Sequence, residues 1–219
     1  MPNKVRYGLK NVHYATVTFA TDGTPTFGTP VAIPGAVSAS LSKQGDTYTF
    51  YADDGSYFEL GDNASYEGDL VIALIPQSFR VAALGETLDG KGVLFEDSNP
   101  TRGHFALLFE FTGDDKAIRH VLYNCTASEN TIEGQTKGEN IEVQPETLTI
   151  TAKALPNGGP VKAKTGDATD ATVYAGWYET VHQFVTPTTA CRIRWRRGWI
   201  SSTYSAFTSY CRRSWSCGG

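Results

Sequence analysis

The strongest constraint on the fold is a set of short segments in which apolar and polar residues alternate. In residues 146–154, Leu148, Ile150 and Ala152 fall on one face of an extended chain, and Thr and Lys residues fall on the other. A period of two indicates a strand with one buried face. Similar segments, rich in aromatic and β-branched residues, occupy residues 12–19, 37–41, 47–52, 66–75, 104–111 and 117–127. These residue types favour strands, so the chain is predicted to be mainly β.

The order of these segments predicts an antiparallel fold. Residues 104–111 and 117–127 are separated by the Gly-Asp-Asp-Lys turn at 113–116, which is typical of a hairpin. One helix is expected, at residues 76–84, because Pro76 suits the first helical position and Gly85 the position after the end. Phe79 and Ala83 share one face of that helix with Pro76. We therefore predict an antiparallel β-sandwich or barrel with one short flanking helix, not an α/β fold.

Three long connections break the pattern, at residues 20–36, 53–65 and 128–140, and each is polar and rich in glycine. Unstructured loops of this length are unusual in a compact domain and tend to be either functional or disordered. We expect the region around residues 42–69 to need a partner surface for its order.

The last 33 residues differ sharply from the rest of the chain. Residues 1–186 hold 13 basic and 23 acidic side chains, a net charge of −10, whereas residues 187–219 hold six Arg and no acid. The same segment holds three of the four Cys and three of the four Trp. This break predicts a domain at 1–186 and a poorly ordered extension at 187–219. The extension is either out-of-frame translation or a basic, aromatic segment that contacts DNA or a virion partner.

Catalytic motifs of the hydrolase, phosphate-loop, zinc-protease and C-x-x-C types are absent, so we expect no enzyme, no cofactor and no metal. Asp53 and Asp54 could share a cation or act as acid and base with Glu67, but adjacent residues in a turn point apart, which favours a solvated turn. Cys125 lies in an apolar strand and is expected to be a buried small hydrophobe.

The sequence contains two combinations of residues that could be considered as metal sites. His104 and His120 could be cross-strand neighbours in the hairpin, either as a metal pair or as a pair without metal on the surface or in a groove. His182 with Cys191, Cys211 and Cys217 has spacings that match no tight zinc ligand pair. No stretch of 18 apolar residues is present and no apolar segment follows the N-terminal charges, so we expect no membrane insertion and synthesis in the cytoplasm.

Several strings, taken in order, resemble the major tail tube protein of long-tailed (siphovirus-type) bacteriophages, of the phi13-type family. They are NKVRYGLKNVHYA (3–15), AIPGAV (32–37), TFYADD (49–54), YEGDLVIALIP (66–76), HFALLFEF (104–111), IRHVLYNCTAS (118–128), ETLTITAKAL (146–155) and YAGWYETV (174–181). The resemblance covers about residues 1–181 and is specific through the number and order of the strings.

The resemblance implies a β-sandwich whose copies form hexameric rings that stack into a hollow tube in the virion tail. DNA would pass through the lumen without sequence-specific binding, and tape-measure, tail terminator and distal tail proteins would be partners. An acidic chain fits this reading, since acidic walls repel phosphates. From the polar phases of three strands we predict that the lumen is lined by Glu67, Asp69, Glu110, Glu142 and Glu146. An acidic outer surface is the alternative.

The resemblance also implies a long loop that lies on a neighbouring subunit. We assign it to residues 48–66, which are too apolar for a free loop. The contact residues are expected to be Tyr48, Phe50, Tyr51, Asp53, Asp54, Tyr57 and Phe58. Core packing within one subunit is the alternative for some of them.

The sequence therefore leaves three functions open. A structural tube subunit predicts concentration-dependent assembly into rings or tubes. A nucleic-acid-binding module predicts salt-dependent DNA retention that disappears when residues 187–219 are deleted. A hydrolase built on Asp53, Asp54 and Glu67 requires a concave pocket around these carboxylates.

Overall fold

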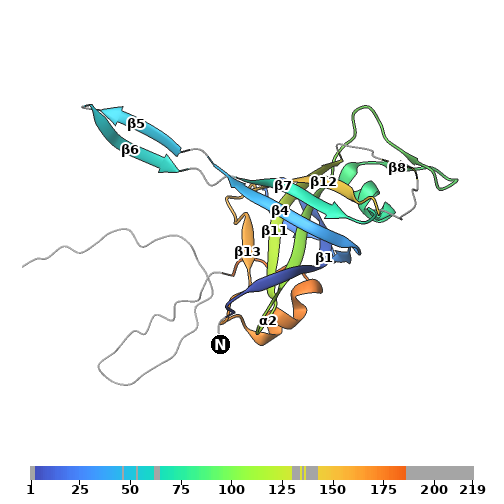
Figure 1. Ribbon diagram of the computed structural model, residues 1–219. Coiled ribbons are helices and arrows are strands. Elements are labelled where there is room, and N and C mark those ends of the chain that lie inside the picture. Colours follow the sequence, from blue (N-terminus) through green and yellow to red (C-terminus); the bar gives the residue numbers. More distant parts are fainter. Residues whose placement is uncertain are drawn as a thin grey trace, which may run out of the picture. The chain divides into compact units, whose positions relative to one another are not determined.

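The computed structural model describes residues 3–45, 47–52, 54–61, 65–129, 134, 136 and 143–185. These residues form a mainly β structure in which all the paired strands are antiparallel (Figure 1). The prediction of a mainly β, antiparallel, sandwich-like fold is confirmed.

The strands follow the chain in an order close to that expected from the alternating segments. They are β1 Arg6–Phe19, β2 Pro25–Phe27, β3 Val31–Ala32, β4 Ala36–Gln44, β5 Thr47–Ala52, β6 Gly55–Gly61, β7 Ser65–Ile72, β8 Thr87–Leu88, β9 Leu94–Phe95, β10 His104–Gly113, β11 Ile118–Glu129, β12 Glu146–Lys153 and β13 Lys162–Lys164. The helical segments are α1 Gln77–Phe79, the π-helical turn η1 Arg80–Leu84, α2 Ala171–Ala175 and the 3₁₀ turn η2 Gly176–Tyr178.

Nine strands form one sheet in the order β2-β1-β10-β11-β12-β7-β4, with β3 paired to β1 and β13 paired to β11. The sheet curls, because β4 near one end of this path contacts β1 near the other. Gly68 in β7 permits the close approach of β4: a Cβ at that position would lie 1.8 Å from the carbonyl oxygen of Ser40. The curl gives the sheet two arms that face each other across a core, as the layers of a sandwich do.

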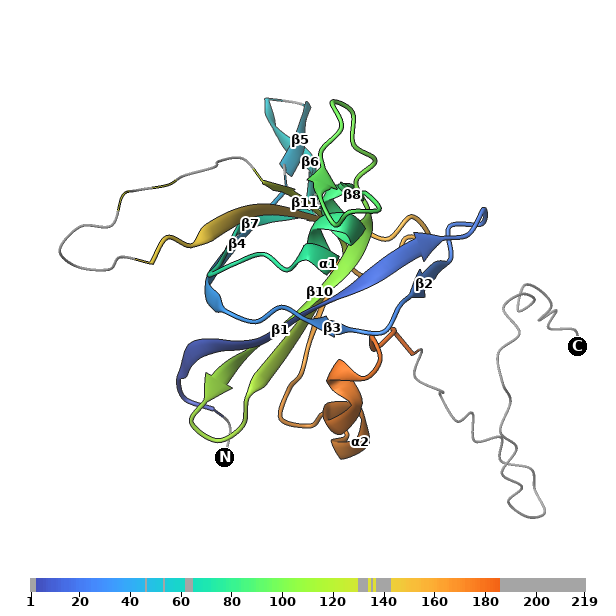
Figure 2. The ribbon, with the colours of Figure 1, turned by 90° about the vertical axis from the view of Figure 1, so that its right-hand side faces the viewer.

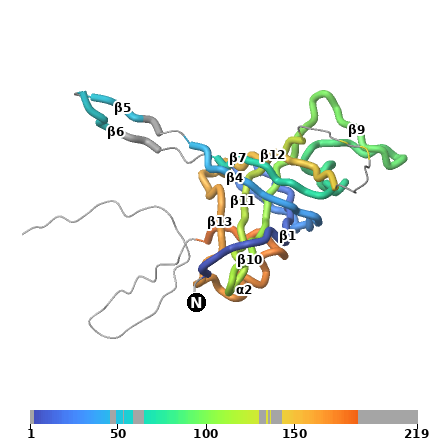
Figure 3. Tube along the Cα trace, in the orientation of Figure 1, coloured from blue at the N-terminus to red at the C-terminus, as the bar shows by residue number. Residues whose placement is uncertain are grey.

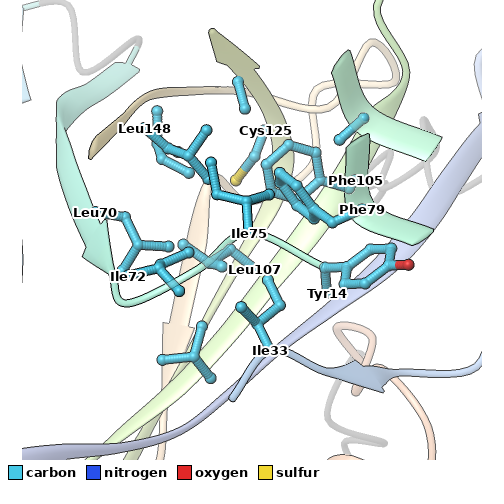
Figure 4. Close-up of a cluster of buried hydrophobic side chains, with 14 of the residues drawn as sticks. Tyr14, Ile33, Leu70, Ile72, Ile75, Phe79, Phe105, Leu107, Cys125 and Leu148 are labelled. Atoms are coloured by element: carbon cyan, nitrogen blue, oxygen red, sulfur yellow. The ribbon is translucent and has the colours of Figure 1, made fainter. Parts of the chain in front are cut away.

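The main core fills the space between these arms. Val12 and Tyr14 from β1 pack in the same cluster as Leu70 and Ile72 from β7. Phe79 of α1 is fully buried and stands edge-on to the rings of Tyr14 and Phe105. Figure 4 shows these side chains converging from the helical segment and from β1, β7, β10, β11 and β12.

A second core lies on the opposite face of β10. Ala106 and Leu108 of β10 pack with Tyr123 of β11 and with Trp177 of η2. The segment that contains α2 and η2 lies away from α1, as Figures 1 and 2 show. Strand β10 is therefore buried on both faces along most of its length, which explains its nearly continuous apolar sequence.

The predicted helix at 76–84 is confirmed with one adjustment. Pro76 is extended and precedes the helix as its cap, while Gly85 adopts φ 82°, the left-handed geometry expected after a helix end. The prediction of one short helix is incomplete, because α2 forms near the C-terminal end of the described residues. Asp170 begins it by accepting a hydrogen bond from the backbone N–H of Thr172 at 2.8 Å.

Two of the predicted long loops are wrong in extent. Residues 55–61 of the 53–65 connection form β6, which pairs with β5. The 20–36 connection contributes β2 and β3, which both pair with β1. Most of the 128–140 connection lies outside the described residues.

The chain divides by its contacts into two units, Met1–Gln183 and Phe184–Gly219. The extension predicted at 187–219, with its three Cys, lies outside the described residues. The predicted boundary after residue 186 stays a prediction. In the described part of the chain, no helix is long and apolar enough to cross a membrane.

Candidate interaction surfaces

The β5–β6 hairpin presents aromatic side chains to solvent. It continues from the paired ends of β4 and β7, where Gln44 lies opposite Ser65, and Figures 1 and 3 show it projecting from the sheet. The exposed fractions of its aromatic side chains are Phe50 49%, Tyr51 71%, Tyr57 74% and Phe58 54%. Exposure of large apolar side chains to water is unfavourable, so their presence on a projecting hairpin indicates a contact surface. We call Thr47–Gly61 the aromatic hairpin.

The turn of the aromatic hairpin carries a carboxylate. Asp54 is exposed and adopts φ 62°, a left-handed turn conformation that Asp tolerates, and Ala52 lies opposite Gly55 across the turn. The prediction of a turn holds at Asp54. Asp53 and the side chain of Tyr48 lie outside the described residues.

A second surface is built from hydroxyl groups in cross-strand rungs. One rung runs Ser40–Asp69–Thr149–Ser128 and the next runs Ser42–Glu67–Thr151–Thr126, across β4, β7, β12 and β11. Ser38, Val71 and Thr147 form a third, shorter rung. The residues that alternate with them, such as Leu70 and Ile150, belong to the main core. We call these three rungs the hydroxyl face.

The hydroxyl face is polar, small in side-chain size and acidic. Asp69 accepts a hydrogen bond from the Thr149 hydroxyl at 3.0 Å, and the Ser42 hydroxyl donates to the backbone carbonyl of Glu67 at 3.0 Å. Glu67 and Asp69 are both exposed. The rungs hold no Arg and no aromatic side chain. Lys153 lies on the same face of β12, two residues after Thr151 of the Glu67 rung, and it pairs with Ser65.

Glu110 is not available to a solvent-filled lumen, which corrects its prediction. The second core covers its face of β10, and the residue is only 7% exposed. Its carboxylate accepts hydrogen bonds from Arg119 at 3.0 Å, Asn11 at 2.7 Å and Tyr178 at 3.1 Å. Burial and this carboxylate raise the pKa of the Tyr178 hydroxyl, so Tyr178 remains a donor. Glu110 therefore holds η2 against the sheet.

Glu146 is likewise occupied within the subunit. It accepts from the backbone N–H of Ile75 at 2.7 Å and pairs with Arg80 at 3.3 Å. Arg80 also pairs with Glu129 at 2.6 Å and Glu86 at 3.2 Å. Burial alone would lower the pKa of Arg80, but these carboxylates raise it overall. This cluster fixes η1 to the ends of β11 and β12, and the carboxylate of Glu146 is directed to it. Glu142 lies outside the described residues.

The sequence matches the family described as phage tail tube protein over residues 2–192. This match covers most of the 219 residues. The chain belongs to the phage tail tube protein family. A search of curated proteins finds no match.

Membership in this family establishes the general function of the protein. This tail tube protein is a structural component of the bacteriophage virion tail, and it assembles with itself and with other tail proteins into the tail tube. The resemblance found in the sequence is thereby confirmed. The family match runs past residue 186 to residue 192, so it includes the start of the predicted extension.

The predicted cross-strand pair of His104 and His120 is not formed in the described part of this tail tube protein. His120 lies opposite Phe109, whereas His104 bonds Asn124 at 2.8 Å, so the two His are not cross-strand neighbours. No group of three or more His, Cys, Asp or Glu side chains could hold a metal among the described residues. Cys125 is fully buried, as predicted, and burial raises the pKa of its thiol to about 12.

Sequence reasoning missed most of the hydroxyl face. The Thr alternation of residues 146–154 indicates one strand of this face, but the sequence-based predictions do not connect the three Ser of β4 with Glu67 and Asp69. The signal that could have found them is the S-x-S-x-S spacing at 38–42, which places all three hydroxyls on one face.

Proposed function

We propose that this tail tube protein forms hexameric rings that stack into a hollow tube, and that phage DNA passes through a lumen lined by the hydroxyl face. The observation that supports this most is the hydroxyl face itself. An exposed sheet surface of Ser and Thr with two carboxylates has little apolar area to attract another protein surface. It has the chemistry expected of a wall in contact with water and moving DNA.

The electrostatics of the hydroxyl face suit DNA transit. DNA binding gains most of its affinity from cations that replace condensed counterions, and from aromatic rings that stack on bases. The three rungs supply neither, and Glu67 and Asp69 repel phosphates. Of the predicted lumen residues we retain these two, while Glu142 remains a prediction.

The aromatic hairpin is proposed to contact a neighbouring copy. Burial of Phe50, Tyr51, Tyr57 and Phe58 would remove large apolar groups from water. Tyr48, Asp53 and Asp54, which the sequence predicted for the same contact, are kept in it as part of this proposal. Strand β4 is an edge of the nine-stranded sheet, and closure into a ring covers such an edge.

The remaining parts of the proposal follow from assembly. Tape-measure, tail terminator and distal tail proteins are the partners expected at the inside and the ends of such a tube. No enzymatic activity, cofactor or metal is assigned to the chain, because its family is structural.

The test is electron microscopy of the purified full chain at rising concentration, followed by a helical reconstruction. Hollow tubes with six copies per ring and β4, β7 and β12 on the inner wall are expected. Tubes with the hydroxyl face outside would overturn the lumen assignment, and a chain that stays monomeric even with the other tail proteins would overturn the tube proposal.

Deletion of the basic extension provides a second test. Residues 1–186 are expected to assemble as the full chain does, with no loss on removing residues 187–219. A full chain that stays monomeric but retains DNA in a salt-dependent way, lost on this deletion, would favour the nucleic-acid-binding alternative.

A further inference from the structure

One end of the main core opens into a cavity of about 180 Å³. It lies between the β4–β7 arm, which contributes Leu41 and Tyr66, and the opposite arm, which contributes Phe111 and His120. Arg6 from β1 and Lys162 from β13 also line it. We call it the His120 pocket. It is separate from both the hydroxyl face and the aromatic hairpin.

His120 sits in this pocket with both ring nitrogens unsatisfied. The residue is 5% exposed, yet neither Nδ1 nor Nε2 has a hydrogen-bond partner in the structure. Its ring stacks on Phe109 with centroids 5.2 Å apart and an interplanar angle of 10°, and it meets Phe111 edge-on at 5.5 Å. Buried polar groups without partners are rare and costly, so this imidazole indicates a hydrogen-bonding ligand.

The charges around the pocket define the ligand as an anion. The Arg6 guanidinium lies 5.1 Å from the Phe111 ring centroid, and the Lys162 ammonium lies 4.8 Å from that of Tyr66. Neither cation has an ion-pair partner among the described residues, and Lys164 adds a third positive charge nearby. Two unpaired cations and a neutral imidazole N–H, set among aromatic rings, match a carboxylate on a short apolar stem.

We propose that the His120 pocket binds the carboxylate of Asp54 from the aromatic hairpin of a second copy of this chain. This rests on the proposed assembly and names the contact within it. Three observations select the occupant. Asp54 is exposed at the hairpin turn, it carries the charge that the pocket lacks, and its flanking Tyr51 and Tyr57 are 71% and 74% exposed, more than the other aromatic side chains that the structure describes in the hairpin. Their rings would pack against the aromatic rim formed by Tyr66 and Phe111.

Disulfide trapping between copies tests the contact. The full chain with Cys191→Ser, Cys211→Ser and Cys217→Ser is the background, and Cys125 stays buried. Copies carrying Asp54→Cys are mixed with copies carrying Lys162→Cys under assembly conditions and mild oxidation. The mixture should give at least tenfold more crosslinked dimer than a control mixture in which Asp97→Cys replaces Asp54→Cys, since Asp97 is also an exposed acid in a loop.

Charge exchange supplies a second readout. Asp54→Lys and Lys162→Glu should each raise the concentration needed for tube formation about tenfold or more, and the double variant should recover most of the loss. Asp97→Lys should leave this concentration unchanged. Equal losses for Asp54→Lys and Asp97→Lys, or a double variant no better than the singles, would overturn the contact.

Acetate tests the ligand chemistry of the unassembled full chain. Millimolar acetate should shift the His120 ring resonances, and Lys162→Ala should abolish the shift. No shift would overturn the anion site. A shift without crosslinking would assign the pocket to a free small anion and overturn the second-copy occupant. Wild-type tubes without the crosslink would overturn this proposal alone, whereas a wild-type chain that forms no tubes would overturn it together with the proposed assembly.

Discussion

At the residue scale, His120 should make stability depend on pH. Burial, and then the charges of Lys162, Arg6 and Lys164, lower its pKa from 6.5 to about 4. The unfolded state therefore binds more protons between these two values, so the free energy of unfolding falls as the pH is lowered through that window. At pH 4.5 the loss from this one group is roughly 2 kcal/mol.

Urea unfolding of the full chain at pH 7 and pH 4.5 measures this effect. His120→Phe keeps an aromatic ring between Phe109 and Phe111 but removes the titrating group. The variant should lose less stability than the wild type over this range. An equal loss in both proteins would show that His120 is not the group responsible.

Cys125 should be chemically silent in the folded chain. Burial holds the pKa of its thiol near 12, and only the thiolate reacts with disulfide reagents. In the background with Cys191→Ser, Cys211→Ser and Cys217→Ser, an aromatic disulfide reagent at pH 8 should label no thiol until urea is added. Full labelling of the native protein within seconds would contradict the buried position.

At the element scale, the pairing of β4 with β7 depends on Gly68. A Cβ there would meet the Ser40 carbonyl oxygen at 1.8 Å, so Gly68→Ala must push the two strands apart. We expect a loss of about 2 kcal/mol or more in the free energy of unfolding, measured by urea titration. Gly90→Ala is the matched control, because a Cβ at Gly90 has no atom within 4 Å and should change stability little.

The elements that the sequence predicted well are those with one buried face. In β12, Leu148, Ile150 and Ala152 are buried in the core, and the Thr residues that alternate with them are partly or fully exposed. Strand β6 lies in a segment that the sequence predicts to be a loop, because its exposed aromatic residues produce no alternation of apolar and polar positions. Helix α2 was missed because it is short, although the unbroken apolar run of β10 already implied a second covering layer.

At the scale of the whole molecule, the candidate surfaces depend on pairing that no single segment encodes. Glu67 and Glu110 look equivalent in the sequence, since each sits in the polar phase of a strand. Only the position of α2 and η2 separates them, by covering the face that carries Glu110. The His120 pocket also joins residues from β1, β4, β7, β10, β11 and β13, which meet through the curl of the sheet.

The lumen assignment makes a prediction about DNA at this scale. Glu67→Lys with Asp69→Lys replaces two anions per copy by two cations on the hydroxyl face. Both side chains are exposed and outside the two cores, so tubes should still form. Their inner walls should then hold short DNA duplexes, with several-fold more retention at about 50 mM than at 200 mM salt, since each new phosphate contact steepens the salt dependence.

The control carries the same change of charge on a loop. Glu96→Lys and Asp97→Lys change two exposed side chains in the segment after β9, which is not part of the three rungs. If only net charge mattered, both double variants would retain DNA equally in a sedimentation assay with assembled tubes. That result would overturn the assignment of the hydroxyl face to the lumen. If the rungs line the channel, the Glu67 and Asp69 variant alone should protect bound DNA from nuclease, because DNA held inside a tube is out of reach of the enzyme.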